Sequence, residues 1–476
     1  HAIKKSVEVM IRSVKIILLL LITKATYGQP ASFVIYPGSP FLVNHAHGVH
    51  QAASGSIFLS GYGEDVGGVF SLISFTKFDE NGSRLFVKYF GDSTHHFMMM
   101  RMLVLDDNNY ILAGSKYLPG GNSSPYAVKI DSTGTIIWEK NVNTNYNSYY
   151  TGVSRFSNGN LVFAGAASDS INSDLNLMGV ITDSLGHDLH SFSFGEPVIN
   201  ETAENCVVSD NGLIAVCGDR LINTTIVNPY VVAFDSTGNF LWEMGISSHN
   251  NSGSKNLYLD KEGKLLVVGE SATTSSPQFD VQLTKIDIGS VTTIWQKLIP
   301  GTNMSDAGFA ISETIDGNYS LAGYGHDSIS NSKKVLFLIT DTSGNELSKK
   351  YFGNSSINIG YAISPSVYGG FLIAGADFVS DRQILIYQKE LGIDVSELQN
   401  EQMSIYPNPI LTNSMIRFQQ PVLSVRVTDL QGRPVLQIEK KQSFTTTTIP
   451  FLNNGLYFIE CSSETKHFYS TLIVCE

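Results

Sequence analysis

The sequence predicts an all-β protein, a seven-bladed β-propeller followed by a small β-sandwich domain. The first observation is that seven strands reach a glycine at intervals of 51 to 54 residues. The second is that the residue six positions earlier is always glycine or asparagine, which tolerate the left-handed backbone of a tight hairpin. The third is that the positions four and two before each glycine are apolar, as in a buried strand. The repeat glycines are Gly61, Gly114, Gly165, Gly218, Gly269, Gly323 and Gly375.

Each repeat is predicted to be a four-stranded antiparallel meander. An apolar residue twelve positions before each repeat glycine places a strand across the hairpin turn. After the glycine come a polar loop of variable length, a third strand, a second turn and a fourth strand, as in residues 126–138. Because one such sheet cannot bury both faces alone, a period of about 50 residues with four short strands is typical of a propeller blade.

The two ends of the repeat region predict how the ring closes. The seventh repeat ends after Gln383–Tyr387, before a recognisable fourth strand, while the strand-like segment Phe33–Gly38 has no partner in its own repeat. We therefore expect the N-terminal strand to complete the seventh blade and to cover an otherwise open sheet edge. The predicted propeller spans residues 29–391.

The N-terminus is typical of a secretory signal peptide, predicted over residues 1–28 with an upstream extension before Met10. A basic segment, Met10–Lys15, precedes the apolar run Ile16–Ile22 and the small-residue exit Thr26–Gly28. The apolar run is far shorter than the roughly 20 residues of a membrane helix. The mature protein is therefore expected outside the inner membrane, with no membrane span.

Composition argues against nucleic acid as a partner and does not decide which cysteines form disulfides. The net charge is −12 and the repeats lack clustered Lys and Arg, which argues against nucleic acid. Cys206 and Cys217 lie on one hairpin, where a disulfide is conceivable, but both occupy apolar positions of the repeat, which favours buried thiols. Whether Cys461 and Cys475 form a disulfide stays open. Zinc-type Cys spacing is absent, and no cofactor or metal is predicted.

A different module follows a polar connector at residues 392–402. It alternates apolar and polar residues between glycine turns, as a small β-sandwich of about 70 residues does. Its opening Tyr-Pro-Asn-Pro, its Val-x-Val-x-Asp-x-x-Gly-Arg hairpin and its Asn-Gly-Leu-Tyr strand resemble the C-terminal sorting domain of the Bacteroidetes type IX (Por) secretion system, over residues 403–476. The residues that carry the resemblance are Tyr406, Pro407, Asn408, Pro409, Asp429, Gly432, Gly455 and Tyr457.

The resemblance implies how the protein is exported and where it ends up. It implies inner-membrane export by the general pathway and outer-membrane passage by the type IX machinery, the expected partner of this domain. It also implies removal of the tail, with release of the protein or attachment to the cell surface. Ser470–Thr471 stand where such tails often carry a lysine, a departure that concerns processing.

Local catalytic motifs are absent from the sequence. His45 and His47 are expected to share a strand face, where they either pack or, with His50, hold a metal. Four aspartates in the turns between third and fourth strands are expected to accept backbone hydrogen bonds, with Trp138, Trp242 and Trp295 filling gaps between blades. These aspartates are Asp131, Asp183, Asp235 and Asp341.

The variable loops after the repeat glycines are the predicted recognition face, because length varies where structure does not fix it. Carboxylates beside aromatic rings suit an extracellular glycan or protein ligand. The predicted function is therefore an extracellular binding or scaffold module, and the alternative is a glycan hydrolase or lyase with paired loop carboxylates. The predicted binding residues are Tyr62, Asp65, Tyr117, Asp219, Arg220, Glu270, Tyr324, His326, Asp327 and Asp377.

Overall fold

The structure is a computed structural model with two compact units, residues 1–390 and 391–476. The predicted signal peptide and connector lie outside the residues that it describes. These are 33–35, 37, 43–65, 68–105, 108–117, 121–142, 146–168, 174–197, 199–222, 226–246, 252–272, 278–301, 304–314, 316–327, 330–353, 357–379, 381–388, 405–406, 410–411, 414–428, 434–449, 452–453, 455–463 and 467–475.

In the first unit, the described strands form five four-stranded antiparallel sheets and one eight-stranded sheet, in which a single parallel pair, Ser71 with His96, joins two four-stranded groups. We number these seven groups of four strands as blades 1 to 7 along the chain. Blade 1 has β2 (Val43–Gln51), β3 (Ile57–Glu64), β4 (Ser71–Phe78) and β5 (Arg84–Phe90). Blade 2 has β6 (His96–Val104), β7 (Tyr110–Tyr117), β8 (Ser123–Ile130) and β9 (Ile136–Asn141). Blade 3 has β10 (Ser148–Arg155), β11 (Leu161–Ser168), β12 (Leu175–Thr182) and β13 (Asp188–Phe194).

The remaining blades repeat this order. Blade 4 has β14 (Asn200–Val208), β15 (Ile214–Ile222), β16 (Ile226–Phe234) and β17 (Phe240–Gly245). Blade 5 has β18 (Ser252–Leu259), β19 (Leu265–Ala272), β20 (Phe279–Asp287) and β21 (Thr292–Ile299). Blade 6 has β22 (Met304–Glu313), β23 (Tyr319–Asp327), β24 (Ser332–Thr340) and β25 (Glu346–Phe352). Blade 7 has β26 (Asn358–Pro365), β27 (Phe371–Asp377), β28 (Arg382–Gln388) and β1 (Phe33–Ile35).

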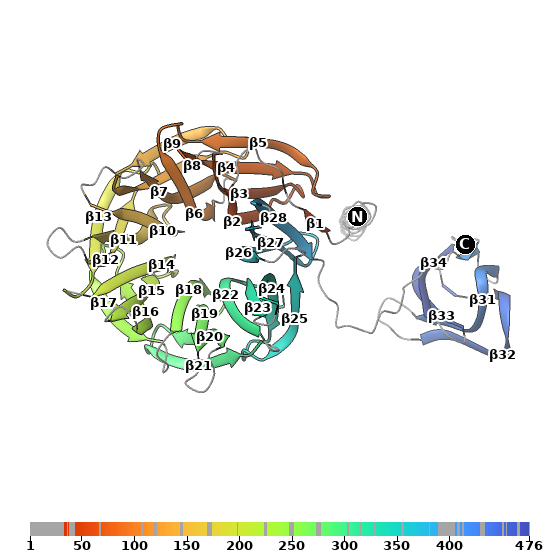
Figure 1. Cartoon of the computed structure of the whole chain (residues 1–476). Coiled ribbons are helices and arrows are strands. Elements are labelled where there is room, and N and C mark those ends of the chain that lie inside the picture. The colour runs from red at the N-terminus through yellow and green to blue at the C-terminus, as the bar shows by residue number, and fades with distance from the viewer. Residues whose placement is uncertain are drawn as a thin grey trace, which may run out of the picture. The chain divides into compact units, whose positions relative to one another are not determined.

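The blades follow one another around a ring, with β2, β6, β10, β14, β18, β22 and β26 on the inside (Figure 1). The prediction of an all-β propeller is confirmed. The predicted closure is also confirmed, since β1 pairs antiparallel with β28, with Phe33 opposite Tyr387 and Ile35 opposite Leu385. The first strand of the described chain is therefore the outer strand of the last blade.

The turn between the first two strands of each blade has the predicted backbone. The glycine or asparagine six positions before each repeat glycine has a positive φ in all seven blades, between 60° at Asn108 and 91° at Gly159. In each turn the amide of this residue donates to the carbonyl three positions earlier, for example Gly159 N to Phe156 O at 2.9 Å. The second turns are held as predicted, because Asp131 Oδ1 accepts from the amides of Thr133 and Thr135.

The hydrophobic core lies between neighbouring blades. Cys206 and Val216 of blade 4 pack with Val162 of blade 3, whereas Cys217 packs with Leu257 of blade 5. Cys206 lies opposite Val216 and Cys217 opposite Asn205, so the two thiols point to opposite faces of one sheet. Both are buried and free, as predicted. Burial raises the pKa of each thiol.

The second unit has its own sheet and core. Its strands are β29 (Ile405–Tyr406), β30 (Ile410–Leu411), β31 (Met415–Thr428), β32 (Pro434–Thr448), β33 (Gly455–Ser462) and β34 (His467–Cys475). Ile416, Val425, Ile459 and Val474 are among the buried residues of this core, together with Cys461. In the described part of the chain, no helix has the length and apolar character to cross a membrane.

Candidate functional site

The innermost strand of every blade carries a β-bulge at the same place. In blade 1, Ala46 lies opposite Gly61 and Gly48 opposite Ser60, so His47 is an extra residue without a partner in the ladder. The same shift recurs in the other six blades. The bulged residues stand fourteen positions before the repeat glycines. They are His47, Met100, Thr151, Glu204, Lys255, Phe309 and Tyr361.

These bulged residues line one cavity within the ring. Its volume is about 100 Å³, and one water needs roughly 10–15 Å³ of such volume, so the cavity has room for a group larger than a single water. Arg101, the residue after the bulge of blade 2, completes the lining. Since the bulges point seven side chains toward the axis, the fold itself gathers residues that are far apart in sequence.

One side of the cavity is aromatic. The ring of His47 stacks on Tyr361 at 4.5 Å and on Tyr62 at 5.8 Å between centroids, and His45 stacks on Tyr62 at 5.0 Å. Phe309 continues the series, 5.6 Å from Tyr361. Tyr324 then lies 5.7 Å from Phe309. We call Tyr62, His45, His47, Tyr361, Phe309 and Tyr324, from blades 1, 7 and 6, the aromatic arc.

The other side is charged. Lys255 Nζ lies 3.9 Å from both Asp219 Oδ2 and Glu270 Oε1, and Glu270 also accepts a hydrogen bond from Tyr324 at 3.3 Å. Arg101 donates from Nε to the Thr151 carbonyl at 3.3 Å and from Nη2 to the Glu204 carbonyl at 3.1 Å. We call Arg101, Glu204, Asp219, Lys255 and Glu270 the charged cluster. The Tyr324–Glu270 hydrogen bond joins it to the aromatic arc.

Glu204 holds its proton more tightly than an ordinary glutamate. Burial raises the pKa of its carboxyl to about 7, although Lys255 and Arg101 act in the opposite direction. For Lys255, burial lowers the pKa, but the neighbouring Glu204, Asp219 and Glu270 outweigh it and the pKa is raised overall. Near neutral pH, Lys255 is therefore charged and Glu204 is divided between its two forms.

His47 contributes a neutral imidazole. Burial, followed by the positive charge that His45 and Arg101 place nearby, holds the pKa of His47 well below its usual value. Its Nε2 atom is buried and has no hydrogen-bond partner among the described residues. A buried polar atom without a partner is costly in a closed core, so on a cavity wall His47 Nε2 is an atom to which a bound group could hydrogen-bond.

Four of the predicted binding residues reach this cavity region. Tyr62 and Tyr324 belong to the aromatic arc, and Asp219 and Glu270 to the charged cluster. Asp219 is fixed by the next blade, because its Oδ1 accepts from Ser254 N at 2.8 Å and from Ser254 Oγ at 3.1 Å.

The other predicted binding residues have local partners. Asp65 Oδ1 accepts from the amides of Val69 and Phe70, at 2.6 and 2.9 Å. The Arg220 guanidinium pairs with Glu201 at 3.2 Å and with Glu243 at 2.9 Å.

His326 near the end of β23 and Asp377 at the end of β27 also form contacts with residues of the loops that follow them. His326 Nε2 lies 3.2 Å from Asn331 Oδ1. Asp377 is buried and accepts from Val379 N at 3.0 Å. The backbone of Asp327 ends β23, while its side chain lies outside the described residues.

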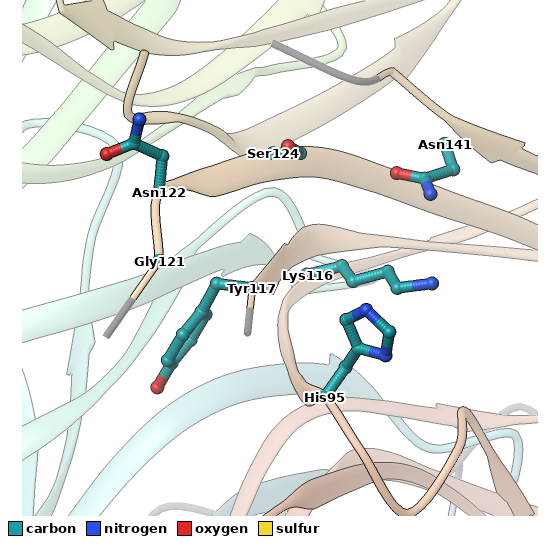
Figure 2. A pocket seen from close by; sticks show the side chains of 7 residues that line it. All are labelled: His95, Lys116, Tyr117, Gly121, Asn122, Ser124 and Asn141. Carbon is teal, nitrogen blue, oxygen red and sulfur yellow. The ribbon is translucent and has the colours of Figure 1, made fainter. Parts of the chain in front are cut away.

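Tyr117 lines a second, separate pocket of about 200 Å³ on blade 2. Figure 2 shows Lys116 and His95 together at one end of this pocket and the Tyr117 ring at the other. The Tyr117 ring stacks on His96 at 4.8 Å, and Lys116 lies 3.7 Å from Asp92. The pocket is polar and belongs to one blade, whereas the central cavity draws on all seven.

The described residues contain no group of three or more His, Cys, Asp or Glu side chains arranged to hold a metal ion. His45 and His47 share one side, as predicted, but their rings stack in parallel at 6.0 Å. The expected packing role of the tryptophans holds at Trp138, whose Nε1 donates to the Ser184 carbonyl of the next blade at 3.2 Å.

The sorting residues are partly described. Tyr457 is buried in β33 and donates to the Asn453 carbonyl at 2.9 Å, and Gly455 pairs with Val474. Tyr406 belongs to β29, opposite Arg417. The others, Pro407, Asn408, Pro409, Asp429 and Gly432, lie outside the described residues.

Comparison with known families identifies the second unit. Residues 404–475 match the family described as secretion system C-terminal sorting domain. The predicted type IX (Por) sorting domain is thereby confirmed. It indicates export of the chain to the cell surface or the extracellular space and interaction with the type IX machinery. No curated protein is similar enough to the chain to count as a match.

Solved structures resemble the first unit. A virginiamycin B lyase from Staphylococcus aureus, solved with quinupristin, is 12% identical, with 75% of this chain and 100% of that chain covered and a TM-score of 0.49. A polysaccharide lyase of family PL25, an ulvan lyase, is 12% identical over 74% and 96%, with a TM-score of 0.47. The Neurospora crassa Pan2 WD40 domain is 10% identical over 76% and 95%, also with a TM-score of 0.47. None of the three bears on what this chain binds.

Proposed function

We propose that the chain is an exported binding protein whose ligand enters the central cavity of the propeller. The observation that carries this proposal is the contrast between two sets of positions in the repeat. The turn residues, the repeat glycines and the core positions keep one chemical character in all seven blades. The bulged position instead carries histidine, methionine, threonine, glutamate, lysine, phenylalanine and tyrosine. The propeller fold does not require different residue types at this position. A ligand site does, because it contacts its ligand with several different side chains.

The composition of the cavity supports a polar organic ligand. Aromatic faces on one side and charged groups on the other suit a sugar or a peptide side chain, because rings cover apolar faces while acids and bases bind polar groups. Tyr62, Asp219, Glu270 and Tyr324 are the sequence-predicted residues that we assign to this site. We further propose that the mature binding domain comprises residues 29–391 after loss of residues 1–28, and that residues 403–476 serve export.

Glycan cleavage is the second candidate function. Glu204 favours it, because a carboxyl group with a pKa of about 7 can both take up and release a proton near neutral pH. Hydrolysis of a glycoside uses two carboxyl groups flanking one bond. Among the described residues that line the cavity, Glu204 is the one carboxylate, so the lining favours binding or a one-base elimination over hydrolysis.

A ligand screen tests the proposal. The chain from residue 29 onward is applied to a glycan array and to extracellular protein extracts, and each retained glycan is then incubated with the protein and analysed for cleavage. Phe309→Ala removes a ring of the cavity wall, and retention should fall at least about tenfold, since aromatic pairs and their buried area contribute a few kcal/mol.

The control for this screen is Phe240→Ala on outer strand β17, where the ring is 53% exposed. This variant should keep wild-type retention. If the two substitutions have equal effects, or if both screens retain nothing, the central cavity is not a binding site.

A further inference from the structure

The charged cluster has one carboxylate more than its cations can balance. Arg101 and Lys255 bring two positive charges, and Glu204, Asp219 and Glu270 bring three negative ones when all are ionised. Lys255 lies between Asp219 and Glu270, at 3.9 Å from each. Arg101 uses its Nη2 on the backbone carbonyl of Glu204 and not on the carboxylate. Among the described residues, Glu204 therefore has no cationic group within 4 Å of its carboxylate, whereas Asp219 and Glu270 each lie 3.9 Å from Lys255 Nζ.

Besides the cations Arg101 and Lys255, the cavity that Glu204 lines offers a neutral acceptor and aromatic rings. His47 presents a buried Nε2 without a partner among the described residues, and in the tautomer with the proton on Nδ1 this atom accepts a hydrogen bond. Phe309 and Tyr361 present aromatic rings to the same cavity. Ring faces carry partial negative charge and attract cations.

We propose that the group bound in this cavity is an organic ammonium ion, which pairs with the Glu204 carboxylate, donates to His47 Nε2 and lies against Phe309 and Tyr361. This inference rests on the proposed binding function and names the chemistry of its ligand. Both an amino sugar and a lysine side chain carry such a group. A carboxylate or sulfate ligand would instead add negative charge beside three acids, and a neutral ligand would leave Glu204 uncompensated.

The charge of Glu204 makes binding dependent on pH. Burial, Asp219 and Glu270 favour the protonated form of Glu204, while Lys255 and Arg101 favour its ionised form, and the pKa of the carboxyl without ligand is about 7. Tyr149 and Cys217 also lie near Glu204, and burial raises the pKa of each, so both stay uncharged near neutral pH. An ammonium ion binds the ionised form better. Affinity should therefore increase from pH 6 to pH 8, by up to about tenfold, because the ionised fraction increases by that factor around a pKa of 7. Over this range a lysine ammonium stays charged.

Two matched pairs of compounds test the inference by titration calorimetry with the chain from residue 29 onward. The first pair is Nα-acetyl-lysine amide and its Nε-acetylated form, and the second is glucosamine and N-acetylglucosamine. Acetylation removes the positive charge in both pairs. The charged member of at least one pair should bind at least about tenfold more tightly, and the pair that responds identifies the source of the ammonium group.

Glu204→Gln, which keeps the side-chain shape, should remove both the preference for the charged member and the increase with pH. Glu346→Gln, at an exposed carboxylate of outer strand β25, should change neither. Equal binding of charged and acetylated members, or no binding of any of the four compounds, overturns the inference. Retention of an uncharged or anionic glycan in the array, lost in Phe309→Ala, would keep the binding function while rejecting the ammonium ligand.

Discussion

At the scale of the residue, the bulge explains why glycine recurs. The repeat glycine lies beside the bulge of the innermost strand, and a Cβ atom built on it overlaps a carbonyl oxygen of that strand in every blade. In blade 3 the overlap is between Gly165 and the carbonyl of Tyr149. In each blade this carbonyl belongs to the residue two positions before the bulged residue, so the invariant glycine and the variable bulged position lie side by side in the fold.

Gly165→Ala should destabilise the propeller, because the obstacle is backbone that cannot move aside as a side chain can. We expect a loss of roughly 2 kcal/mol or more in unfolding free energy, measured as a lower melting temperature and urea midpoint. Gly245→Ala is the matched control, since a Cβ atom at this position would have no other atom within 4 Å, and it should stay within about 0.5 kcal/mol of the parent. Equal melting of the two variants would reject the steric explanation.

The proposed site is only partly predictable from single residues. Tyr62, Asp219, Glu270 and Tyr324 follow the repeat glycines in sequence, so a search of the variable loops finds them. Glu204 and Lys255 were missed because a period of two continues through a strand and gives no sign of an extra residue. The available signal is their offset of fourteen from the repeat glycine, where the seven repeats carry seven different residue types.

At the scale of the element, ring closure depends on a short strand. β1 comprises three residues, yet it covers the edge of β28, whose residues Ile384, Leu385 and Ile386 are buried. The sequence predicts this pairing because the seventh repeat lacks a fourth strand. The hairpin turns were equally predictable, since a positive φ restricts the residue type at one position. The register of the bulges was not, because it depends on contacts between strands.

Deletion of residues 29–40 should lower the melting temperature of the propeller sharply. Without β1, the backbone groups on the outer side of β28 lose their partners, while those on the other side still pair with β27, and β28 becomes the edge of its sheet. Thermal unfolding followed by circular dichroism measures the effect. Deletion of residues 1–28 alone serves as the comparison and should leave the melting temperature unchanged. If the two truncated proteins have the same melting temperature, β1 does not close the ring.

At the scale of the whole molecule, the proposed functions of recognition and export fall on two separate units. Each has its own sheets and its own hydrophobic core, and the sorting domain matches its family over nearly its full extent, residues 404–475. A separate core means that each unit can fold by burying its own apolar residues. The identity of the second unit is predictable from sequence because its motifs are contiguous segments of the chain. The residues that line the cavity of the first unit come from seven different blades and meet only in the ring, so the sequence alone does not bring them together.

This division predicts that the export signal is transferable. Fusion of residues 392–476 to a periplasmically targeted reporter should move the reporter to the cell surface or the medium in a host with the type IX machinery, as measured by fractionation and protease accessibility. The chain lacking residues 403–476 should remain in the periplasm, yet it should melt at the temperature of the propeller in the full chain, because its core is complete. A reporter that stays in the periplasm would show that export needs the propeller as well. A lower melting temperature of the shortened chain would show that the two units stabilise each other.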